Sequence, residues 1–536
     1  MTSVIPADLA VGAFSSEPPW LIDPDALVWR SGSTQRRNAT QAQVPRLLRR
    51  RVLPPGRRVI KVAFRLGGAL AGWYLIERRR ARRIGEPEVS RAGLSRRLRK
   101  AFQSLGPTYI KLGQILSSGE GLFPPELVNE FRLLRDRVPP ETFDTVRKVV
   151  EEDLGATLEE VFSFFDRRPL AAASIAQVHA ARLLSGENVV VKVQRPSVSP
   201  NVREDLAAMS WIAPHLIGRI PVASLANPPA LVELFAETIV EELDFRLEAD
   251  NMLDVAAVFA ATEQRHVVVP RPHPQLVTRR VLVMERLSGF TFDDVEGMSA
   301  AGIDTTEVVR ALMISFLEGA TLYGVFHGDL HGGNLFVQPD GRVALLDYGI
   351  TGRLDQPRRL AFLRLLMGGT INDPKMQLSA LRDLGALPAD TDLDAVMVDL
   401  GIDQPVRDPT KMSPEELLSE IRDITRKLLA YGAKLPKVLM LYVKDLLFID
   451  GALATLAPDL DLFEEVTRIA LYFTARHGER IAAEVGVDPR ATAVDLDGLR
   501  ASLGVPSEVE SMSYRDLQER RQLIRKRMRD HHRSKR

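Results

Sequence analysis

Two short motifs between residues 327 and 349 hold three oxygen-bearing side chains. The first, HGDLHGGN, places Asp329 five positions before Asn334, and Asp347 follows an apolar segment in the motif DYG. Carboxylate and amide oxygens bind Mg²⁺, and a positioned carboxylate orients water or a hydroxyl. We therefore expect a metal-bound phosphate site with Asp329 as the catalytic residue and with Asn334 and Asp347 as metal ligands. Polar turn residues beside glycine are the simpler alternative.

A lysine in an apolar segment supplies a cation. Lys192 alternates with valines in VVVKVQRP, which predicts a strand and places the ammonium at the α- and β-phosphates of ATP. A buried ammonium needs a carboxylate partner, and Glu248 in EELDFRLEADN is the candidate. The alternative is a solvated lysine at a sheet edge. Together with the two motifs above, this pair has the order of the parts in a protein-kinase site.

The elements that position these residues follow from hydrophobic periodicity. Helices are predicted from near residue 55 to 117 with a break at Gly106-Pro107, and again within 123–140, 199–218, 230–259 and most of the chain after 305. Strands are predicted at 175–183 and 189–194, joined by SGEN as a hairpin, and at 267–269, 281–285, LFV and VALLD. This order suggests a small β-containing lobe followed by a larger helical lobe, with a ligand cleft between them.

Five motifs in order resemble the UbiB/AarF family of atypical protein-kinase-like proteins, which is linked to isoprenoid quinone biosynthesis. They are KLGQ (111–114), AAAS (171–174), VVVKVQRP, ELD (242–244) and HGDLHGGN with LLDYG, within a resemblance that runs from about Leu94 to Leu462. The resemblance implies an α+β, bilobal protein-kinase-like fold with a small β-containing N-lobe, a larger helical C-lobe and an N-terminal helical extension over the cleft.

The expected domains follow from that resemblance and from composition. They are a flexible leader (1–50), a basic amphipathic segment at a membrane interface (51–90), a KxGQ helical extension (91–165), an N-lobe (166–287), a helical C-lobe with the catalytic loop and DYG (288–480) and a C-terminal extension with a basic tail (481–536).

The resemblance also implies roles for residues outside the metal and lysine motifs. Lys111 and Gln114 would contact Glu242 and Asp244 beside the cleft. The adenine edge would meet backbone groups of Met284, Glu285 and Leu287.

The expected phosphate loop contains no glycine. Its residues are Ala171, Ala172, Ala173 and Ser174. A Cβ restricts the close backbone approach that glycine allows, so we expect ATP to bind in an altered pose and to be hydrolysed slowly. His179 in the same segment is expected to be a packed strand residue, whereas the sequence leaves open whether His331 packs under the catalytic loop or positions a phosphate.

The net charge of +1 hides two basic ends. Residues 30–100 hold 21 Lys or Arg against 3 Asp or Glu, and residues 515–536 hold 10 against 3. The segment 59–80 reads VIKVAFRLGGALAGWYLIERRR, which predicts an interfacial helix with Trp73 and Tyr74 at headgroup level. A helix docked on the protein body is the alternative.

No secretory signal is visible, and the 536 residues include no cysteine, so disulfides and thiolate metal sites are excluded.

Together these features predict an atypical kinase-like, ATP-binding and Mg²⁺-dependent ATPase. We expect it to support isoprenoid quinone (ubiquinone or menaquinone) or related lipid metabolism, in the cytoplasm and peripherally attached to a membrane. An isoprenoid or quinone lipid, an anionic membrane surface and quinone-biosynthesis proteins are the expected partners, and nucleic acid is not. The alternatives are a phosphotransferase acting on a small-molecule, lipid or protein hydroxyl, and a nucleotide-switched membrane adaptor. Two features depart from the family pattern. The segment SSGEGLFP lacks the arginine that family members often carry after KxGQ. The chain ends in a basic tail, whereas some bacterial members end in a pair of membrane-spanning helices.

Overall fold

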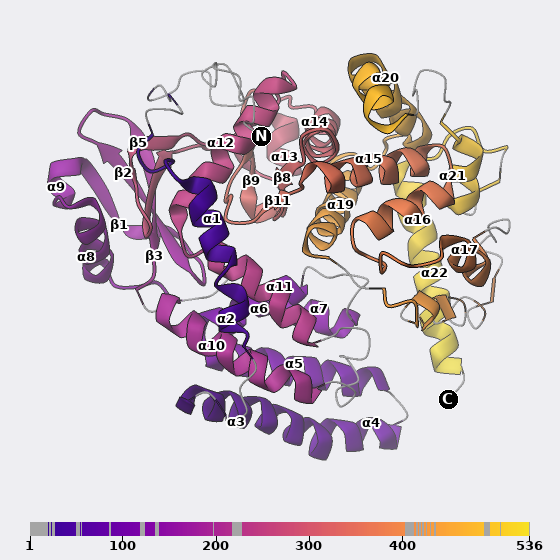
Figure 1. Ribbon diagram of the computed structural model, residues 1–536, viewed down its shortest axis with the longest axis horizontal. Helices are drawn as coiled ribbons and strands as arrows, with labels where there is room; N and C mark the ends of the chain where they lie inside the picture. The colour runs from indigo at the N-terminus through magenta and orange to yellow at the C-terminus, as the bar shows by residue number, and fades with distance from the viewer. Residues whose placement is uncertain are drawn as a thin grey trace. The chain divides into compact units, whose positions relative to one another are not determined.

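Figure 1 shows the computed structural model of the chain. It describes residues 20, 23, 27–49, 54, 56–84, 87–117, 124–134, 139–196, 198–216, 228–402, 412–413, 416, 420, 423–424, 426–428, 430–433, 436–486, 494–503, 505–506 and 508–534. The segment expected to lack the family arginine, SSGEGLFP, falls mostly outside these residues.

The chain divides into two compact units. Unit 1 comprises Met1–Ala260, Val268–Ser288 and Leu345–Ile350, and unit 2 comprises Ala261–Val267, Gly289–Ala344 and Thr351–Arg536. Lys192, Glu248 and Asp347 therefore lie in unit 1, whereas Asp329 and Asn334 lie in unit 2.

A five-stranded antiparallel sheet forms the β part of unit 1. Its order is β1 (Phe162–Ala172), β2 (Ala176–Leu183), β3 (Asn188–Gln194), β6 (Val281–Glu285) and β5 (Pro272–Val277). The predicted SGEN hairpin between β2 and β3 is confirmed, and Gly186 takes the left-handed conformation (φ 105°) that its turn requires. The strands β1 and β5 were not predicted, because charged residues and prolines interrupt their alternation.

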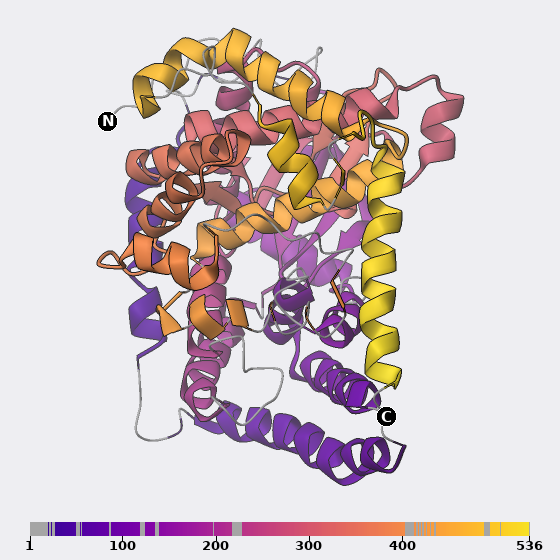
Figure 2. The same ribbon diagram turned by 90° about the vertical axis from the view of Figure 1, so that its right-hand side faces the viewer.

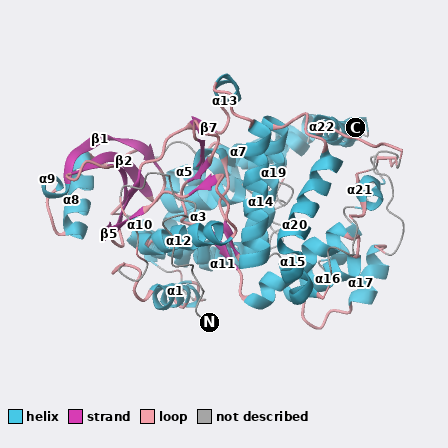
Figure 3. Ribbon diagram, turned by 90° about the horizontal axis from the view of Figure 1, so that it is seen from above, coloured by secondary structure: helices cyan, strands magenta, loops and turns pink. Residues whose placement is uncertain are grey.

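The sheet is anchored by a valine-rich layer. Val189, Val191 and Val193 of β3 are buried together with Val149 and Val150 of α8, and Figure 3 shows α8 and α9 beside the strands. Alternation along β3 thus fixes valines on one face and leaves Lys192 on the other.

His179 of β2 is a packed residue, as predicted. Its Nδ1 lies 2.8 Å from the Asp166 carbonyl oxygen and its Nε2 lies 2.8 Å from Nε2 of Gln177. Burial lowers the pKa of His179, which keeps the ring neutral.

The helices of unit 1 form a bundle beside this sheet. They are α3 (Gly56–Gly72), the π-helical segment η2 (Trp73–Glu77), α4 (Arg78–Ile84), α5 (Pro87–Leu105), α6 (Pro107–Ser117), α7 (Pro125–Arg132), α8 (Phe143–Leu154), α9 (Leu158–Val161), α10 (Val198–Ile212), the 3₁₀ turn η3 (Ala213–Leu216), α11 (Pro228–Glu241) and α12 (Phe245–Ala261). The predicted break at Gly106-Pro107 is confirmed. The single helix predicted over 230–259 is instead two, because Asp244 accepts hydrogen bonds from the Arg246 backbone and side chain and so ends the regular ladder.

The described part of the expected leader is folded, so the prediction of a flexible leader is wrong there. Residues Ser33–Gln41 form α1 and Val44–Leu47 form α2, and Trp29 is buried. Arg30 forms ion pairs with Asp250 and Asp254 of α12 at 3.0 and 2.9 Å. Sequence periodicity did not show this segment because these long-range ion pairs, rather than an apolar stripe, hold it.

Helices α3 and α4 run on as one rod through η2, visible as the long purple helix in Figure 2. Among the described residues, this helix, Gly56–Ile84, is long and apolar enough to cross a membrane by length and composition, and 17% of its most apolar window is buried. Tyr74 is exposed, as an interfacial helix requires, but the Trp73 indole N–H bonds to Ser90 on α5. The placement of Trp73 and Tyr74 at headgroup level stays a prediction.

Unit 2 is mainly helical. Its helices are α13 (Val295–Ala300), α14 (Thr305–Glu318), η5 (Gly319–Tyr323), η6 (Gly332–Asn334), α15 (Gln356–Thr370), α16 (Pro374–Asp383), α17 (Leu393–Leu400), α19 (Lys437–Leu456), α20 (Leu462–Val485), α21 (Leu496–Ser502) and α22 (Tyr514–Ser534). Short strands form one sheet of order β4 (Val267–Val268), β10 (Val343–Leu345), β9 (Leu335–Val337) and β7 (Phe290–Thr291), and a pair of β11 (Thr351–Arg353) with β8 (Val325–His327).

An aromatic cluster fixes α19 beside β8 in unit 2. The Tyr442 ring of α19 stacks on Phe316 of α14 with centroids 5.1 Å apart, and it meets Phe326 of β8 and Phe362 of α15 edge-on. Such contacts between large buried rings stabilise beyond the area they bury. The cluster therefore holds α19 against the strand that leads into HGDLHGGN.

Candidate nucleotide-binding and catalytic site

Lys192 is the central cation of unit 1. Its ammonium on β3 lies 2.6 Å from Oε1 of Glu248 on α12 and 3.0 Å from Oδ1 of Asp347. The side chains of Lys192 and Glu248 are 11% and 3% exposed, whereas that of Asp347 is 46% exposed. The ion pair predicted from the sequence between Lys192 and Glu248 is present, and Asp347 is a second partner that the sequence did not indicate.

Burial and charge shift the pKa values of this pair. Burial raises the pKa of Glu248 to about 7, because the desolvation of its carboxylate outweighs the attraction of Lys192. Burial alone would lower the pKa of Lys192, but the carboxylates of Asp347 and Glu248 outweigh it and raise that pKa. Lys192 is therefore a fixed positive charge at neutral pH.

The backbone around Asp347 is shaped to present its carboxylate. Asp347 lies two residues beyond β10, not at the strand end as predicted, and has a left-handed conformation (φ 59°). Asp tolerates this conformation better than most residues because its side chain bonds locally, and here Oδ1 accepts from the Gly349 N–H at 3.2 Å. The intervening Tyr348 is fully buried, and its carbonyl accepts from Asn251 at 2.8 Å. The buried ring thus anchors a turn whose acidic side chain stays half-exposed.

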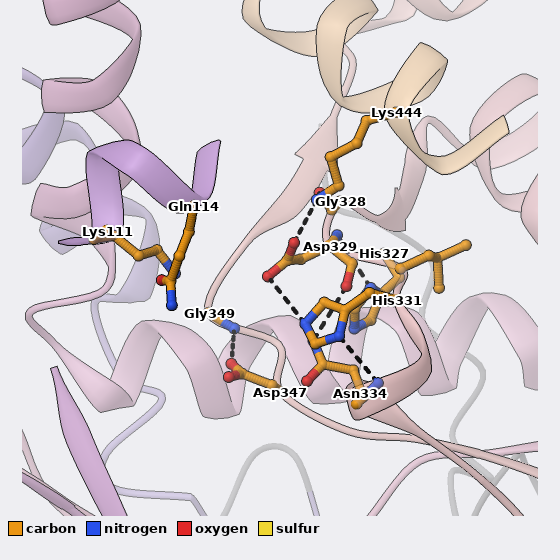
Figure 4. Close-up of polar contacts among 12 residues, drawn as sticks. Lys111, Gln114, His327, Gly328, Asp329, His331, Asn334, Asp347, Gly349 and Lys444 are labelled. Atoms are coloured by element: carbon orange, nitrogen blue, oxygen red, sulfur yellow. Dashed lines mark hydrogen bonds and ion pairs between the residues drawn. The ribbon is translucent and has the colours of Figure 1, made fainter. Parts of the chain in front are cut away.

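The KxGQ helix α6 reaches the same part of unit 1. Lys111 forms an ion pair with Glu242 at 2.9 Å, and both side chains are largely buried. Figure 4 shows the ends of Lys111 and Gln114 lying together on α6. Asp244 pairs with Arg246 at 2.7 Å. The contact of Lys111 with Glu242 that the family resemblance implies is present. The ion-pair partner described for Asp244 is Arg246, two positions away in the sequence.

The alanine-rich segment is a strand end and a tight turn instead of an open loop. Ala171 and Ala172 belong to β1, which corrects the expectation of a loop there. The Ala173 N–H donates to the Ala176 carbonyl at 2.8 Å, which closes the turn, and Ser174 is buried. Buried Arg195 donates to the Ala173 carbonyl at 2.9 Å and so fixes the turn to the end of β3.

The residues expected at the adenine edge lie at the end of β6. Met284 pairs with Val190 in the sheet, and the Glu285 N–H donates to the Arg271 carbonyl at 2.8 Å. Leu287 lies two residues beyond the last residue of β6. Met284 and the N–H of Glu285 are thus engaged in the backbone pairing of the sheet. Of the three residues expected at the adenine edge, Leu287 is the one whose backbone lies beyond the strands.

The catalytic loop in unit 2 is braced from within. The Asn334 side-chain amide donates to the Asp329 carbonyl at 3.1 Å, and the Asp329 N–H donates to Nδ1 of His327 at 3.2 Å. His331 caps the short η6 helix by accepting from the Gly333 N–H, and its Nε2 lies 3.9 Å from Oδ2 of Asp329 (Figure 4). The loop therefore holds the Asp329 and Asn334 side chains in place without help from a ligand.

Two adjacent residues of α19 complete this loop and were missed in the sequence. The Lys444 ammonium pairs with Oδ1 of Asp329 and donates to the Gly328 carbonyl at 3.0 Å (Figure 4). The buried Asp445 accepts from the Leu330 N–H at 3.0 Å. The available signal was a Lys-Asp pair inside the otherwise apolar segment LPKVLMLYVKDLLFIDGALATLAP, which the sequence analysis took for core.

Removing one partner of the buried pair should destabilise unit 1. Glu248→Gln leaves Lys192 buried with only the half-exposed Asp347, and we expect a loss of about 3 kcal/mol in the free energy of unfolding. Lys192→Met combined with Glu248→Leu removes both charges and should recover most of that loss. Urea denaturation measures both variants, with the exposed Glu159→Gln as a control that changes little. If Glu248→Gln is as stable as the wild type, the assignment of a buried ion pair between Lys192 and Glu248 is contradicted.

Asp445 should make unit 2 less stable as the pH rises. Burial raises its pKa well above the usual value, so the folded state keeps a proton that the unfolded chain loses near pH 4. The stabilisation is complete below that pH and is lost as the pH rises toward the folded-state pKa, by up to about 1.4 kcal/mol per pH unit. Asp445→Asn mimics the neutral acid, so the stability of the wild type should fall relative to this variant between pH 5 and 9 in urea denaturation. If the difference in the free energy of unfolding between the wild type and Asp445→Asn does not change with pH, Asp445 is ionised in the folded state over this whole range.

Comparison with known proteins identifies the family. The sequence pattern described as the ABC1 atypical kinase-like domain matches residues 133–379. An uncharacterized protein of Mycobacterium tuberculosis is 36% identical over 414 residues, which cover 73% of this chain and 80% of that protein. The chloroplastic aarF domain-containing protein kinase of Arabidopsis thaliana is 33% identical over 398 residues (69% and 73%), and the "Probable protein kinase UbiB" of Vibrio parahaemolyticus is 33% identical over 382 residues (69% of each). The chain therefore belongs to the ABC1/UbiB (aarF) family of atypical kinase-like proteins and has the α+β, nucleotide-binding kinase-like domain of that family.

Proposed function

We propose that this protein is an ATP-binding, Mg²⁺-dependent ATPase that supports isoprenoid quinone or related lipid metabolism at a membrane surface. The observation that carries the proposal is the placement of Lys192, which is held by buried Glu248 on one side and by half-exposed Asp347 on the other. A cation fixed in this way is suited to bind phosphate oxygens.

The two partners of Lys192 have different roles in this proposal. Glu248 is buried and holds the ammonium on β3, whereas Asp347 is half-exposed and is the partner that an incoming anion replaces. Replacement by a phosphate releases the Asp347 carboxylate, which is then available as a metal ligand.

The donor set fits Mg²⁺. Asp347 offers carboxylate oxygens, and Asn334 uses its amide nitrogen for the Asp329 carbonyl, which leaves its side-chain oxygen as the remaining donor. Oxygen ligands of this kind are those that Mg²⁺ prefers. When bound by Asn334 and Asp347, the ion would neutralise charge on the phosphates.

Asp329 is the catalytic carboxylate of the proposal. It is 23% exposed, and its partner Lys444 fixes one of its oxygens while the loop fixes its backbone. The carboxylate accepts a hydrogen bond from the attacking water or hydroxyl and orients it. Lys444 is a positioning residue in this account, because it holds Asp329 and the Gly328 carbonyl together.

The alanine-rich turn supports the part of the proposal that turnover is slow. Arg195 and the strand pairing fix the Ala173 backbone, so it does not close around phosphates as a glycine loop does. This rigidity favours nucleotide binding with slow hydrolysis over efficient phosphorylation of proteins.

The rod Gly56–Ile84 supports attachment to a membrane. Its exposed large apolar side chains are Ile60, Phe64, Tyr74, Leu75, Ile76 and Ile84. The Arg78 guanidinium lies 5.0 Å from the Tyr74 ring centroid, and Arg79, Arg80, Arg82 and Arg83 are exposed beside it. An apolar stripe next to arginines is suited to an anionic lipid surface, which supports the proposal of a cytoplasmic protein at the membrane periphery.

The direct test is release of phosphate from ATP by the purified chain with Mg²⁺, with and without anionic phosphatidylglycerol liposomes. We expect slow release that the liposomes increase. Asp347→Asn should keep the turn, since Asn also tolerates the left-handed conformation, and should lower turnover by about 10²-fold or more while nucleotide still binds. Unchanged turnover in this variant would contradict the proposal.

Two further readouts separate the alternatives. Transfer of labelled phosphate to a lipid extract or a protein instead of to water would show a phosphotransferase. Loss of quinone in a deletion strain, restored by the wild type and not by Lys192→Ala, would link nucleotide binding to quinone metabolism. Restoration by Asp347→Asn, which is expected to bind nucleotide with little turnover, would favour the nucleotide-switched membrane adaptor.

A further inference from the structure

Unit 1 contains an apolar cavity of about 180 Å³ that the proposed ATPase reaction does not use. Helices α3, α5, α6, α7, α10 and α11 and the η3 turn line it, and every lining residue is apolar except Tyr109, which carries one hydroxyl. An apolar cavity of about 150 Å³ in another protein stays free of water and binds benzene or xenon. This cavity is therefore suited to a hydrocarbon group and not to water or a charged ligand.

The Tyr109 hydroxyl is buried behind the cavity wall and is not accessible from the cavity. The residue is 1% exposed, and its hydroxyl has no hydrogen-bond partner among the described residues. Burial raises its pKa, so the group stays a neutral hydroxyl that donates or accepts one hydrogen bond. The cavity therefore presents an almost wholly apolar wall to a ligand.

Helix α3 connects the cavity with a lipid-facing surface. Val62 and Leu66 line the cavity, whereas Ile60 and Phe64 on the opposite side of the helix are 67% and 77% exposed. A single helix is therefore apolar on both sides. Its Gly68 is exposed, and among the described residues no atom outside this part of the helix lies within 4 Å of the position of an added Cβ, so no described side chain covers the helix surface there.

We infer that this cavity binds part of the hydrocarbon chain of a single lipid molecule that enters beside α3. A space of about 180 Å³ is too small for a protein segment, and the neighbouring exposed apolar face of α3 favours a lipid over a soluble metabolite. The shared chemistry is a long apolar chain, which an isoprenoid alcohol or quinone and a straight-chain fatty acid both have. The site deepens the proposed role in lipid metabolism, but its test uses no nucleotide.

The test uses the fluorescent fatty acid cis-parinaric acid with the purified full chain. We expect saturable one-to-one binding to the wild type. Val232→Phe fills the cavity and should weaken binding at least tenfold with an undiminished melting temperature, because it adds apolar contacts in empty space. Absence of saturable binding to the wild type, or wild-type binding by the filled variant, would overturn the inference. Should Val232→Phe fail to fold, Ala213→Leu fills the same cavity with less added volume and is judged by the same criteria.

Two controls distinguish the cavity from the surface. Val398→Phe makes the same substitution at an exposed position of unit 2, and Phe64→Ser removes an apolar side chain from the outer side of α3. Both should bind the probe as the wild type does. A loss in Phe64→Ser as large as that in Val232→Phe would show adsorption to the helix surface and contradict a cavity site.

Competition tests the source of the ligand. Displacement of the probe by farnesol rather than oleate would assign an isoprenoid chain, and the reverse would assign a straight acyl chain. Failure of both to displace it would show that no such site exists.

Discussion

One buried ammonium organises the candidate site. Lys192 can lie inside unit 1 only because Glu248 and Asp347 compensate its charge, and the two carboxylates are held by different means. Helix α12 fixes Glu248 in the core, whereas buried Tyr348 anchors the turn that presents Asp347. The five-stranded sheet then serves mainly to place Lys192 on the face opposite its valine layer. The fold of unit 1 and its candidate site therefore both depend on compensation of the buried charge of Lys192.

Unit 2 follows a similar principle with a different lysine. Asp329 has Lys444 as its partner, and the neighbouring Asp445 holds the backbone of the loop through Leu330. Both residues come from α19, which the aromatic cluster around Tyr442 fixes beside β8. In each unit, a lysine far away in the sequence therefore fixes the position of a motif carboxylate. The motif shows which residue carries the carboxylate but not where its side chain is held.

The sequence predicted those parts of the fold that have a local pattern. The β2–β3 hairpin, the break at Gly106 and the pairing of Lys192 with Glu248 follow from alternation, turn chemistry and charge compensation. Strand β1, the folded leader and the partner of Asp329 depend on contacts between residues far apart in the chain, which periodicity does not record. The Arg30 and Lys444 ion pairs span more than 100 positions each, so only the folded chain brings their partners together.

The central claim is that ATP phosphates take the place of Asp347 at Lys192. The most direct measurement is the affinity for ATP by calorimetry with the metal removed by a chelator, for the wild type, Asp347→Asn and the exposed control Asp144→Asn. The account predicts that Asp347→Asn binds metal-free ATP about tenfold more tightly than the wild type, because its side chain no longer competes for the ammonium, and that the control is unchanged. Equal or weaker binding by Asp347→Asn would contradict it.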